Sequence, residues 1–439
     1  AAALASVYRR AGFVPPPAKS PVDLAPDEVL PRVGLRAAED FAIVQARHAD
    51  LMLEWIEAVR AAGKLAPPEA LPALLDFGAY DRSTRDAVLA VVGQRGRWLA
   101  RTRHEWRYAA AGESGGSDWE DGSHELRRAY LGELRARDPA EGRARLEEAL
   151  PRERARERAE LLARLEVGLS MDDEPLLERC LDDRAREVRA AAAELLSRLA
   201  GSRLCARMIE RITIRIENEH LEVTLPRTLD EGMMRDGVVD APRGRKGKRA
   251  VWFEQMMAAI PPKHFCERFA IEPQALLALA LASEWAELFS NAWERAAFRH
   301  RDADFAEALL AARPEMLPAP ALWTLFDRDR RERFLAAELK QKVSELGERL
   351  AVIAEIQIEP FGEEFSRSVA RAMHRVMAEP ISYGLERAIS ELARRMNAGI
   401  GPELAAIVER GLDEADLARE IAALLRFRHA MHAAIEESA

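Results

Sequence analysis

The amino-acid sequence predicts an all-α protein, an α-solenoid of stacked helical pairs with a short β-hairpin and an irregular loop inserted near its middle. Ala, Leu, Glu and Arg dominate the composition and aromatic residues make up only 6%, which favours helix. Apolar residues recur at helical spacing along most of the chain, and prolines interrupt them at intervals that suit short paired helices. Residues 212–225 instead alternate apolar and polar side chains with a period of two, which predicts the hairpin.

The clearest helical pair lies in residues 170–211, which predict two antiparallel helices and the start of a third. Asp172, Asp173 and Pro175 suit the N-terminus of the first helix, because acidic residues and proline are favoured there. We expect Gly201 to cap the C-terminus of the second helix. Neither helix can bury its apolar face alone, so each needs a stacked neighbour. The predicted buried face of the second helix consists of Val188, Ala191, Ala192, Leu195, Leu196 and Leu199.

This pair resembles a HEAT repeat. Asp183 stands at the turn between its helices, and Arg189 follows six residues later, directly after Val188. An earlier pair has Asp81 at its turn but carries Ala87 where the central pair carries Arg189, so the repeat is degenerate. Successive helices recur at an offset of about 35 residues, within the range of known helical repeats.

Other segments extend the array on both sides of this pair. Residues 1–36 are rich in proline and predict a segment that wraps the fold or dangles from it. Further N-terminal helices are predicted at 37–62, 69–77, 83–100, 124–136, 138–150 and 152–169, with a turn at 78–81 and an exposed acidic loop at 109–124. The hairpin turns at Asn218, residues 226–249 are predicted to be irregular, and helix returns at 251–259. The predicted domains are a proline-rich segment (1–36), an N-terminal helical array (37–211), the hairpin with a basic loop (212–250) and a C-terminal helical array (251–439).

Composition limits the classes of function. The chain has 439 residues, 48% of them hydrophobic and 32% charged, and a formal net charge of −9. This acidic balance argues against a protein that coats nucleic acid, although a local basic patch remains possible. The longest apolar run, residues 275–282, is far shorter than the roughly 20 residues of a membrane span.

The cysteines and the N-terminus indicate the compartment. Cys180, Cys205 and Cys266 are far apart in apolar helical settings and have no spacing typical of a zinc site or a disulfide framework. The first ten residues, AAALASVYRR, are too short and too charged for a signal peptide. We therefore expect a bacterial cytoplasmic protein that binds no cofactor and no metal.

Several segments resemble an uncharacterised bacterial family, and the resemblance covers most of the chain from about residue 30. They are GQRGRWLA (93–100), LRARDPAEGRARLEE (134–148), GLSMDDEPLLERCLDDRAREVRAAAAELLSRL (168–199) and GRKGKRAVWFEQMMAAIP (244–261). Members of that family have HEAT-like repeats and look to be encoded beside a MoxR-type AAA+ ATPase, a von Willebrand factor A-domain protein and a SWIM zinc-finger protein. The sequence departs from the pattern of this family at TRHEW (102–106), where a small polar turn is expected before Trp106. The family has no established reaction, so the resemblance implies partners and no catalytic residue.

The sharpest local feature is the stretch with Gly93, Arg95, Gly96, Arg97 and Trp98. Two glycines would let the backbone approach a partner closely while the arginines and the indole supply contacts. The alternative is a helix end where Trp98 packs into the next repeat and the arginines face water. No strand precedes this stretch and no Gly-Lys-Ser/Thr follows it, so it is no phosphate loop.

A dense basic cluster is the second candidate partner-binding site. It consists of Arg243, Arg245, Lys246, Lys248 and Arg249. These residues could grip phosphates or an acidic protein surface, and a solvated loop is the alternative. No aromatic residue is interleaved among them, which weakens the case for binding single strands.

For the residues that could be metal ligands or catalytic groups, the sequence pattern favours structural roles. His300, Asp302 and Asp304 fit neither a helix face nor a known binding loop, and a helix–turn junction explains them better. His429 and His432 read as a surface pair on the last helix, and Trp285 and Trp293 as core residues on one helical stripe. Asp172, Asp173, Asp182 and Asp183 read as helix caps. We therefore expect no catalytic residue.

Two functions follow from these observations. The first is a non-enzymatic α-solenoid scaffold or adaptor for protein partners, because stacked repeats form extended binding surfaces. The family context implies the MoxR-type AAA+ ATPase and the A-domain protein as those partners. The alternative is a nucleic-acid-binding protein similar to HEAT-like DNA glycosylases, which would need a continuous basic stripe with aromatic residues and a carboxylate at its centre.

Overall fold

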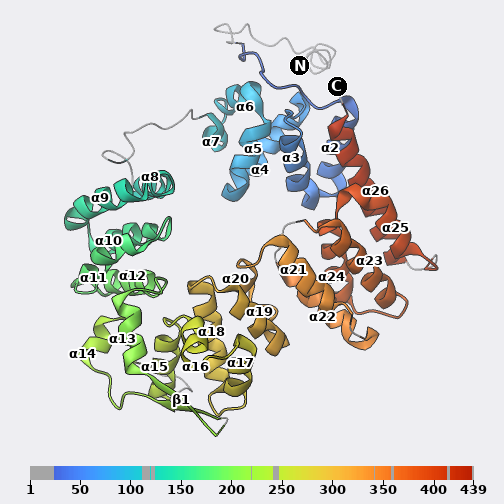
Figure 1. Cartoon of the computed structure of the whole chain (residues 1–439). Helices are drawn as coiled ribbons and strands as arrows, with labels where there is room; N and C mark the ends of the chain where they lie inside the picture. Colours follow the sequence, from blue (N-terminus) through green and yellow to red (C-terminus); the bar gives the residue numbers. More distant parts are fainter. Residues whose placement is uncertain are drawn as a thin grey trace, which may run out of the picture. The chain divides into compact units, whose positions relative to one another are not determined.

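The computed structural model describes residues 24–110, 119, 124–218, 220–240, 247–340, 342–356, 360–412 and 416–437. These residues form 25 α-helices and one two-stranded sheet, which confirms the predicted all-α fold (Figure 1). The chain divides into two compact units, the first made of residues 1–113 with 427–439 and the second of residues 114–426. The domain boundaries predicted at residues 36, 211 and 250 stay predictions.

The first unit is a set of short helices. They are α2 (Leu35–Arg47), α3 (Met52–Ala61), α4 (Leu71–Tyr80), α5 (Arg85–Val91), α6 (Gly93–Ala100), α7 (Arg107–Ala110) and the last turns of α26 (Asp416–Glu436). The single helix predicted for 37–62 is wrong, because His48 takes a φ of −135° and a ψ of 52°, outside the helical region. The helix predicted for 83–100 is also divided, at Gly93, which has a φ of +62°. Gly78, predicted in a turn, lies inside α4.

Part of the proline-rich segment packs onto this unit. The Val33 N–H donates to the Leu65 carbonyl over 3.0 Å, and the Leu65 N–H donates to the Pro31 carbonyl over 2.8 Å. Val33 is buried, so the described residues of the segment wrap the helices. Residues 1–23 lie outside the described residues. The core beneath includes Trp55, whose ring meets Phe41 edge to face with 4.8 Å between centroids.

The second unit begins with six helices. They are α8 (His124–Arg137), α9 (Pro139–Ala149), α10 (Ala155–Leu162), α11 (Glu174–Cys180), α12 (Arg186–Leu196) and α13 (Arg203–Arg211). Val188, Leu195 and Leu196 are buried on α12, as its periodicity predicts. The predicted cap at Gly201 is wrong: α12 ends at Leu196, and Ser202 turns the chain by donating to the Leu196 carbonyl and accepting from the Cys205 N–H.

The predicted hairpin is present between these helices and the rest of the unit. Strands β1 (Thr213–Glu217) and β2 (His220–Thr224) pair antiparallel, with Ile214 opposite Val223. Asn218 turns the chain with a φ of 51°, a left-handed conformation that asparagine tolerates well. The stretch predicted to be irregular contains a short helix, α14 (Glu231–Arg235), whose first turn is capped by the Asp230 carboxylate.

Eleven further helices complete the second unit up to α25. They are α15 (Lys248–Met257), α16 (Pro262–Phe269), α17 (Pro273–Leu281), α18 (Ala286–Arg299), α19 (Ala303–Ala312), α20 (Pro320–Trp323), α21 (Arg328–Glu338), α22 (Val343–Glu355), α23 (Glu363–Met377), α24 (Tyr383–Arg395) and α25 (Gly401–Glu409). Trp293 is fully buried on α18, whereas Trp285 precedes the helix and is only partly buried. The prediction that both are core residues is therefore confirmed for Trp293 and wrong for Trp285. One continuous apolar core runs from Leu131 to Leu425.

Ion pairs join successive helical pairs along the second unit. The partners lie 25 to 36 residues apart, about one repeat. These pairs are Arg128 with Glu160, Arg158 with Asp183, Arg207 with Glu178, Arg330 with Asp304 and Arg367 with Glu403. These ion pairs therefore hold neighbouring repeats in register.

Candidate functional site

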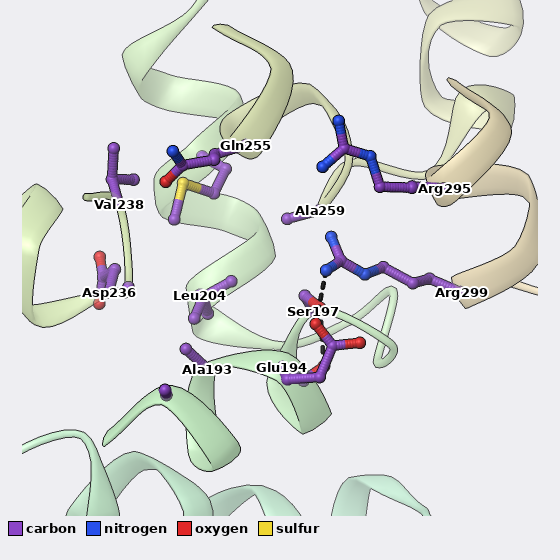
Figure 2. Close-up of a pocket in the computed structure, with 13 residues that line it drawn as sticks. Ala193, Glu194, Ser197, Leu204, Asp236, Val238, Gln255, Ala259, Arg295 and Arg299 are labelled. Carbon is purple, nitrogen blue, oxygen red and sulfur yellow. Dashed lines mark hydrogen bonds and ion pairs between the residues drawn. The ribbon is translucent and has the colours of Figure 1, made fainter. Parts of the chain in front are cut away.

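A hollow of about 150 Å³ opens between α12, α13, α15 and α18 in the second unit (Figure 2). The turn after α14 closes one side of it through Gly237 and Val238. Its apolar wall is formed by Ala190, Ala193, Leu204, Met208, Val238 and Ala259. Helices from both sides of the hairpin thus meet here, although residues 190–208 and 255–299 are distant in sequence.

Two arginines of α18 provide the positive charge of the hollow. Arg295 and Arg299 are four residues apart, so both side chains project from one face of the helix (Figure 2). Arg299 pairs with Glu194 of α12 and donates to the Ala258 carbonyl over 3.0 Å. Arg295 is more exposed and lies 3.7 Å from the buried Glu254 carboxylate. Arg299 therefore ties α18 to α12, whereas Arg295 keeps a solvent-facing guanidinium at the rim.

The opposite side of the hollow is fixed by polar contacts. The Gln255 side chain accepts from the Val239 N–H over 2.8 Å and donates to the Val239 carbonyl over 3.3 Å. The Asp236 carboxylate, almost fully buried, pairs with Arg207, Arg211 and Arg235. Gly237 has a φ of +88°, and a Cβ there would lie only 2.8 Å from the Ala193 side chain. The turn after α14 therefore packs closely against α12.

The polar side chains of this hollow are largely engaged by partners within the chain. The single hydroxyl among the described lining residues, that of Ser197, donates to the Glu194 carbonyl over 2.7 Å, and these residues include no histidine or cysteine. A nucleophile would need a base within hydrogen-bond reach. The volume corresponds to about five waters at roughly 30 Å³ each, enough for one small polar group.

The GQRGRWLA stretch forms α6 in the first unit, and Gly93 approaches the chain's own Glu28, whereas Gly96 lies against Val92. The Glu28 carboxylate accepts from the Gln94 N–H over 2.7 Å and from the Arg95 N–H over 2.9 Å. A Cβ on Gly93 would collide with that carboxylate. Arg95 is exposed, while Arg97 and Trp98 are half-buried. The first helical turn is thus already capped, and these three side chains stay predicted partner contacts.

The following TRHEW segment is ordered by Trp106. Arg103 is extended, and Trp106 is buried with its indole N–H donating to the Asp76 carboxylate over 2.8 Å.

Asp183, Val188 and Arg189 lie at the turn of the central pair. The Asp183 carboxylate accepts from the Ala185 N–H over 2.7 Å and pairs with Arg158 at 2.9 Å. Burial alone would raise its pKa, but these contacts hold the pKa of Asp183 below its usual value. Arg189 donates to the Asp183 carbonyl over 2.8 Å. The aspartate thus binds the preceding repeat, while the arginine closes its own turn.

The basic cluster is only partly described. Arg243, Arg245 and Lys246 lie outside the described residues. Lys248 pairs with Asp240 at 2.7 Å, and Arg249 donates to the Leu225 carbonyl over 3.3 Å. Both side chains therefore have partners within the chain, at the start of α15.

The histidine and acidic residues near α19 take up structural positions. The Asp302 carboxylate accepts from the Phe305 N–H over 3.0 Å and so caps α19, and Asp304 pairs with Arg330 at 2.8 Å. His300 hydrogen-bonds the Ala259 carbonyl over 3.2 Å. Burial, aided by the charge of Arg299, lowers the pKa of His300 to about 4. The prediction of a helix–turn junction fits these contacts.

The cysteine thiols are unreactive in character. Burial raises the pKa of Cys180 to about 11, that of Cys205 to about 12 and that of Cys266 to about 11. Among the described residues, no three His, Cys, Asp or Glu side chains converge on a point that could hold a metal ion.

His429 and His432, predicted to be a surface pair, are both partly exposed, but His432 also has a structural partner. His432 hydrogen-bonds Glu54 over 2.8 Å, and the neighbouring Arg428, only 2% exposed, pairs with the same carboxylate. The Lys64 amine donates to carbonyls at the end of α26, including that of Ile435 over 2.8 Å. The end of α26 is thus a structural part of the first unit, a long-range contact that local sequence cannot show.

Sequence reasoning also missed the residues of the hollow. Arg295 and Arg299 belong to no motif. Glu194 and Gln255 lie in segments that carry the family resemblance, but each reads alone as a surface residue of an amphipathic helix. The one available signal was the four-residue spacing of the arginines beside Trp293 on a predicted buried face.

The model of a protein family of unknown function, DUF5691, matches residues 1–435. The comparison with curated proteins found no match, and neither did the comparison with solved structures. Within the described residues, no helix has both the length and the apolar character needed to cross a membrane.

Proposed function

The chain belongs to DUF5691, a family of unknown function, and on that premise we propose that it is a non-enzymatic helical scaffold that binds protein partners. The partners that we propose are a MoxR-type AAA+ ATPase and a von Willebrand factor A-domain protein, in the bacterial cytoplasm. The observation that carries the proposal is the use of polar residues in the second unit. They hold repeats together, as Arg158 does with Asp183, and they line open hollows.

Repeat architecture gives this proposal its physical basis. Stacked helical pairs expose a long surface whose shape depends on contacts between neighbours, and such surfaces typically bind other proteins. A larger hollow of about 660 Å³ lies where Asp183 and Arg184 meet Glu147, Leu176 and Arg179. Both hollows combine apolar and charged lining, as the core and rim of protein interfaces do.

The nucleic-acid alternative has weaker support. Duplex binding needs a row of cations free to meet phosphates. Lys248 and Arg249, the described part of the basic cluster, instead contact Asp240 and the Leu225 carbonyl. A gel-shift assay at low salt with duplex and single-stranded DNA and with RNA tests it, and retention of any of them at micromolar protein would favour this alternative.

Affinity capture from the native bacterium tests the scaffold proposal. The tagged protein is captured with ATP and, separately, with a non-hydrolysable analogue, and bound proteins are identified by mass spectrometry. We expect the AAA+ ATPase and the A-domain protein to be enriched over a capture with an unrelated helical-repeat protein. Absence of both under each nucleotide condition would contradict the proposed partners.

A further inference from the structure

A second polar hollow, of about 360 Å³, lies at the start of the second unit. It is formed by α8, by the end of α9 and by the short turn of Leu150–Arg152 that follows α9. Its lining residues are Trp119, Arg127, Arg145, Glu148, Ala149 and Arg152. Among the described lining residues, three arginines against one glutamate give a formal charge of +2, in a chain whose net charge is −9.

The arginines of this hollow are unusual in having few partners. Arg152 is exposed and forms no ion pair or hydrogen bond with any described residue. Arg145 has one distant carboxylate, that of Glu141 at 3.9 Å. Arg127 pairs with Glu153 at 2.7 Å, and its Nε is buried without a hydrogen-bond partner. The hollow therefore keeps positive charge that the described residues do not neutralise.

Trp119 adds an aromatic wall to this charge. The Arg127 guanidinium stacks over the indole at 4.8 Å from the ring centroid, and the Tyr130 ring lies 5.9 Å from it. Stacking holds Arg127 in place, so one cation of the hollow is preorganised. An indole beside guanidinium groups is a combination enriched at the energetically important centres of protein interfaces.

We propose that this hollow binds an oxyanion carried by an extended segment of a protein partner, with an apolar or aromatic side chain of that segment against Trp119. Arg145 and Arg152 would bind a carboxylate or phosphate, because guanidinium groups pair with both bidentately. Glu148 at the rim and the negative charge of the whole chain oppose a long polyanion, so a short acidic segment fits better than nucleic acid. This inference deepens the proposed scaffold function and rests on it.

Binding of short fluorescein-labelled peptides to the full chain, measured by fluorescence anisotropy, tests the proposal. One peptide carries a phenylalanine among aspartates and glutamates, a second carries a single phosphoserine beside the phenylalanine, and a third has serines at all charged positions. Binding of the first peptide identifies a carboxylate as the anion, and binding of the second alone identifies a phosphate. If neither binds more tightly than the serine peptide, the proposal is overturned.

Charge-reversal variants assign the binding to this hollow. In Arg145→Glu/Arg152→Glu we expect affinity for the bound peptide to fall about tenfold or more, and in Trp119→Ala we expect a smaller loss. The matched control is Arg387→Glu, which reverses an exposed arginine of α24 that has no ion pair with a described residue and should bind normally. If the control and the double variant lose equal affinity for the peptide, the attraction is non-specific and the proposed site is overturned. Thermal melting confirms that all variants fold.

The same variants separate this inference from the scaffold function. If Arg145→Glu/Arg152→Glu loses the peptide and still binds the ATPase and A-domain protein normally, the hollow is not the docking site and this inference fails while the scaffold proposal stands. If the wild-type chain binds the peptide and neither protein, the proposed partners fail and the anion site stands.

Discussion

At the scale of single residues, one buried arginine organises the start of the second unit. Arg135 is fully buried on α8 and pairs with the equally buried Asp173 at 2.9 Å. It also donates to the carbonyls of Pro139, Leu165, Val167 and Gly168. A single guanidinium therefore joins α8, the start of α9 and the segments leading into α11, using the five donors that arginine has.

Replacing this arginine should be severe. In Arg135→Met, four carbonyls lose a donor and Asp173 keeps only Arg143 as an ion-pair partner. Breaking a buried pair of this kind costs about 3–5 kcal/mol. We expect a large drop in the urea midpoint of unfolding, against little change in the control Arg137→Met, where the arginine is exposed on the same helix. Equal stability of the two variants would contradict the role of Arg135.

A second carboxylate has the corresponding role in the first unit. The Glu54 carboxylate accepts hydrogen bonds from Arg428 and His432. Burial alone would raise the pKa of Glu54, but these hydrogen bonds hold it below its usual value. The stability that the ionised carboxylate provides is present above the pKa of the unfolded chain and is lost as the pH falls through the lower folded pKa.

Neutralising Glu54 should therefore loosen the end of α26 at neutral pH. Glu54→Gln leaves the buried Arg428 without its ion-pair partner Glu54, at an expected cost of about 3 kcal/mol. We expect faster proteolysis of the C-terminal helix and a lower melting temperature. The control is Glu57→Gln on the same helix, whose exposed pair with Arg60 contributes less than about 1 kcal/mol. Unchanged proteolysis in Glu54→Gln would count against this role.

At the scale of helices and strands, local pattern predicted the helices of residues 124–211 and the hairpin that follows them. The apolar periodicity of α12 and the alternation of β1 and β2 are local properties, so the sequence alone was sufficient. The break at His48 could not be predicted in this way, because no glycine or proline marks it and the His48 ring stacks on Phe427, a residue distant in sequence. The hollow of Figure 2 was out of reach for the same reason, since its walls come from distant helices.

The junction of α18 and α19 gives a prediction about pH. The unfolded chain binds a proton at His300 near its ordinary pKa of about 6.5, whereas the folded chain does so only near 4. The unfolded state thus binds more protons between these values, and stability falls as the pH is lowered through this window. The loss is on the order of 2 kcal/mol from about pH 6.5 to pH 5.

Removing this histidine should remove that part of the pH dependence. In His300→Gln we expect urea midpoints that change less between about pH 6.5 and pH 5 than those of the wild-type chain. His220→Gln, at an exposed position of β2, serves as the control and should keep the wild-type dependence. A steeper dependence in His300→Gln than in the control would show that protonation of His300 stabilises the fold, the opposite of what its burial implies.

At the scale of the whole molecule, the structure shows an all-α fold, and the family membership leaves the activity to be proposed. DUF5691 covers nearly the full chain and has no function attached to it. Within the described residues, His300, Asp302 and Asp304, which the sequence analysis considered as metal ligands and assigned to a helix–turn junction, have structural partners. We propose, as the central claim, that this chain works by binding proteins through the surface of its repeats.

Co-elution of purified proteins tests that claim most directly. The full chain is mixed with the MoxR-type ATPase and the A-domain protein, and the complexes are sized by chromatography with light scattering, without nucleotide, with ADP and with ATP. We expect a stable complex in at least one nucleotide state, weakened when Arg145 and Arg152 are reversed in charge. If the chain elutes alone in every nucleotide state, the proposed partnership is contradicted.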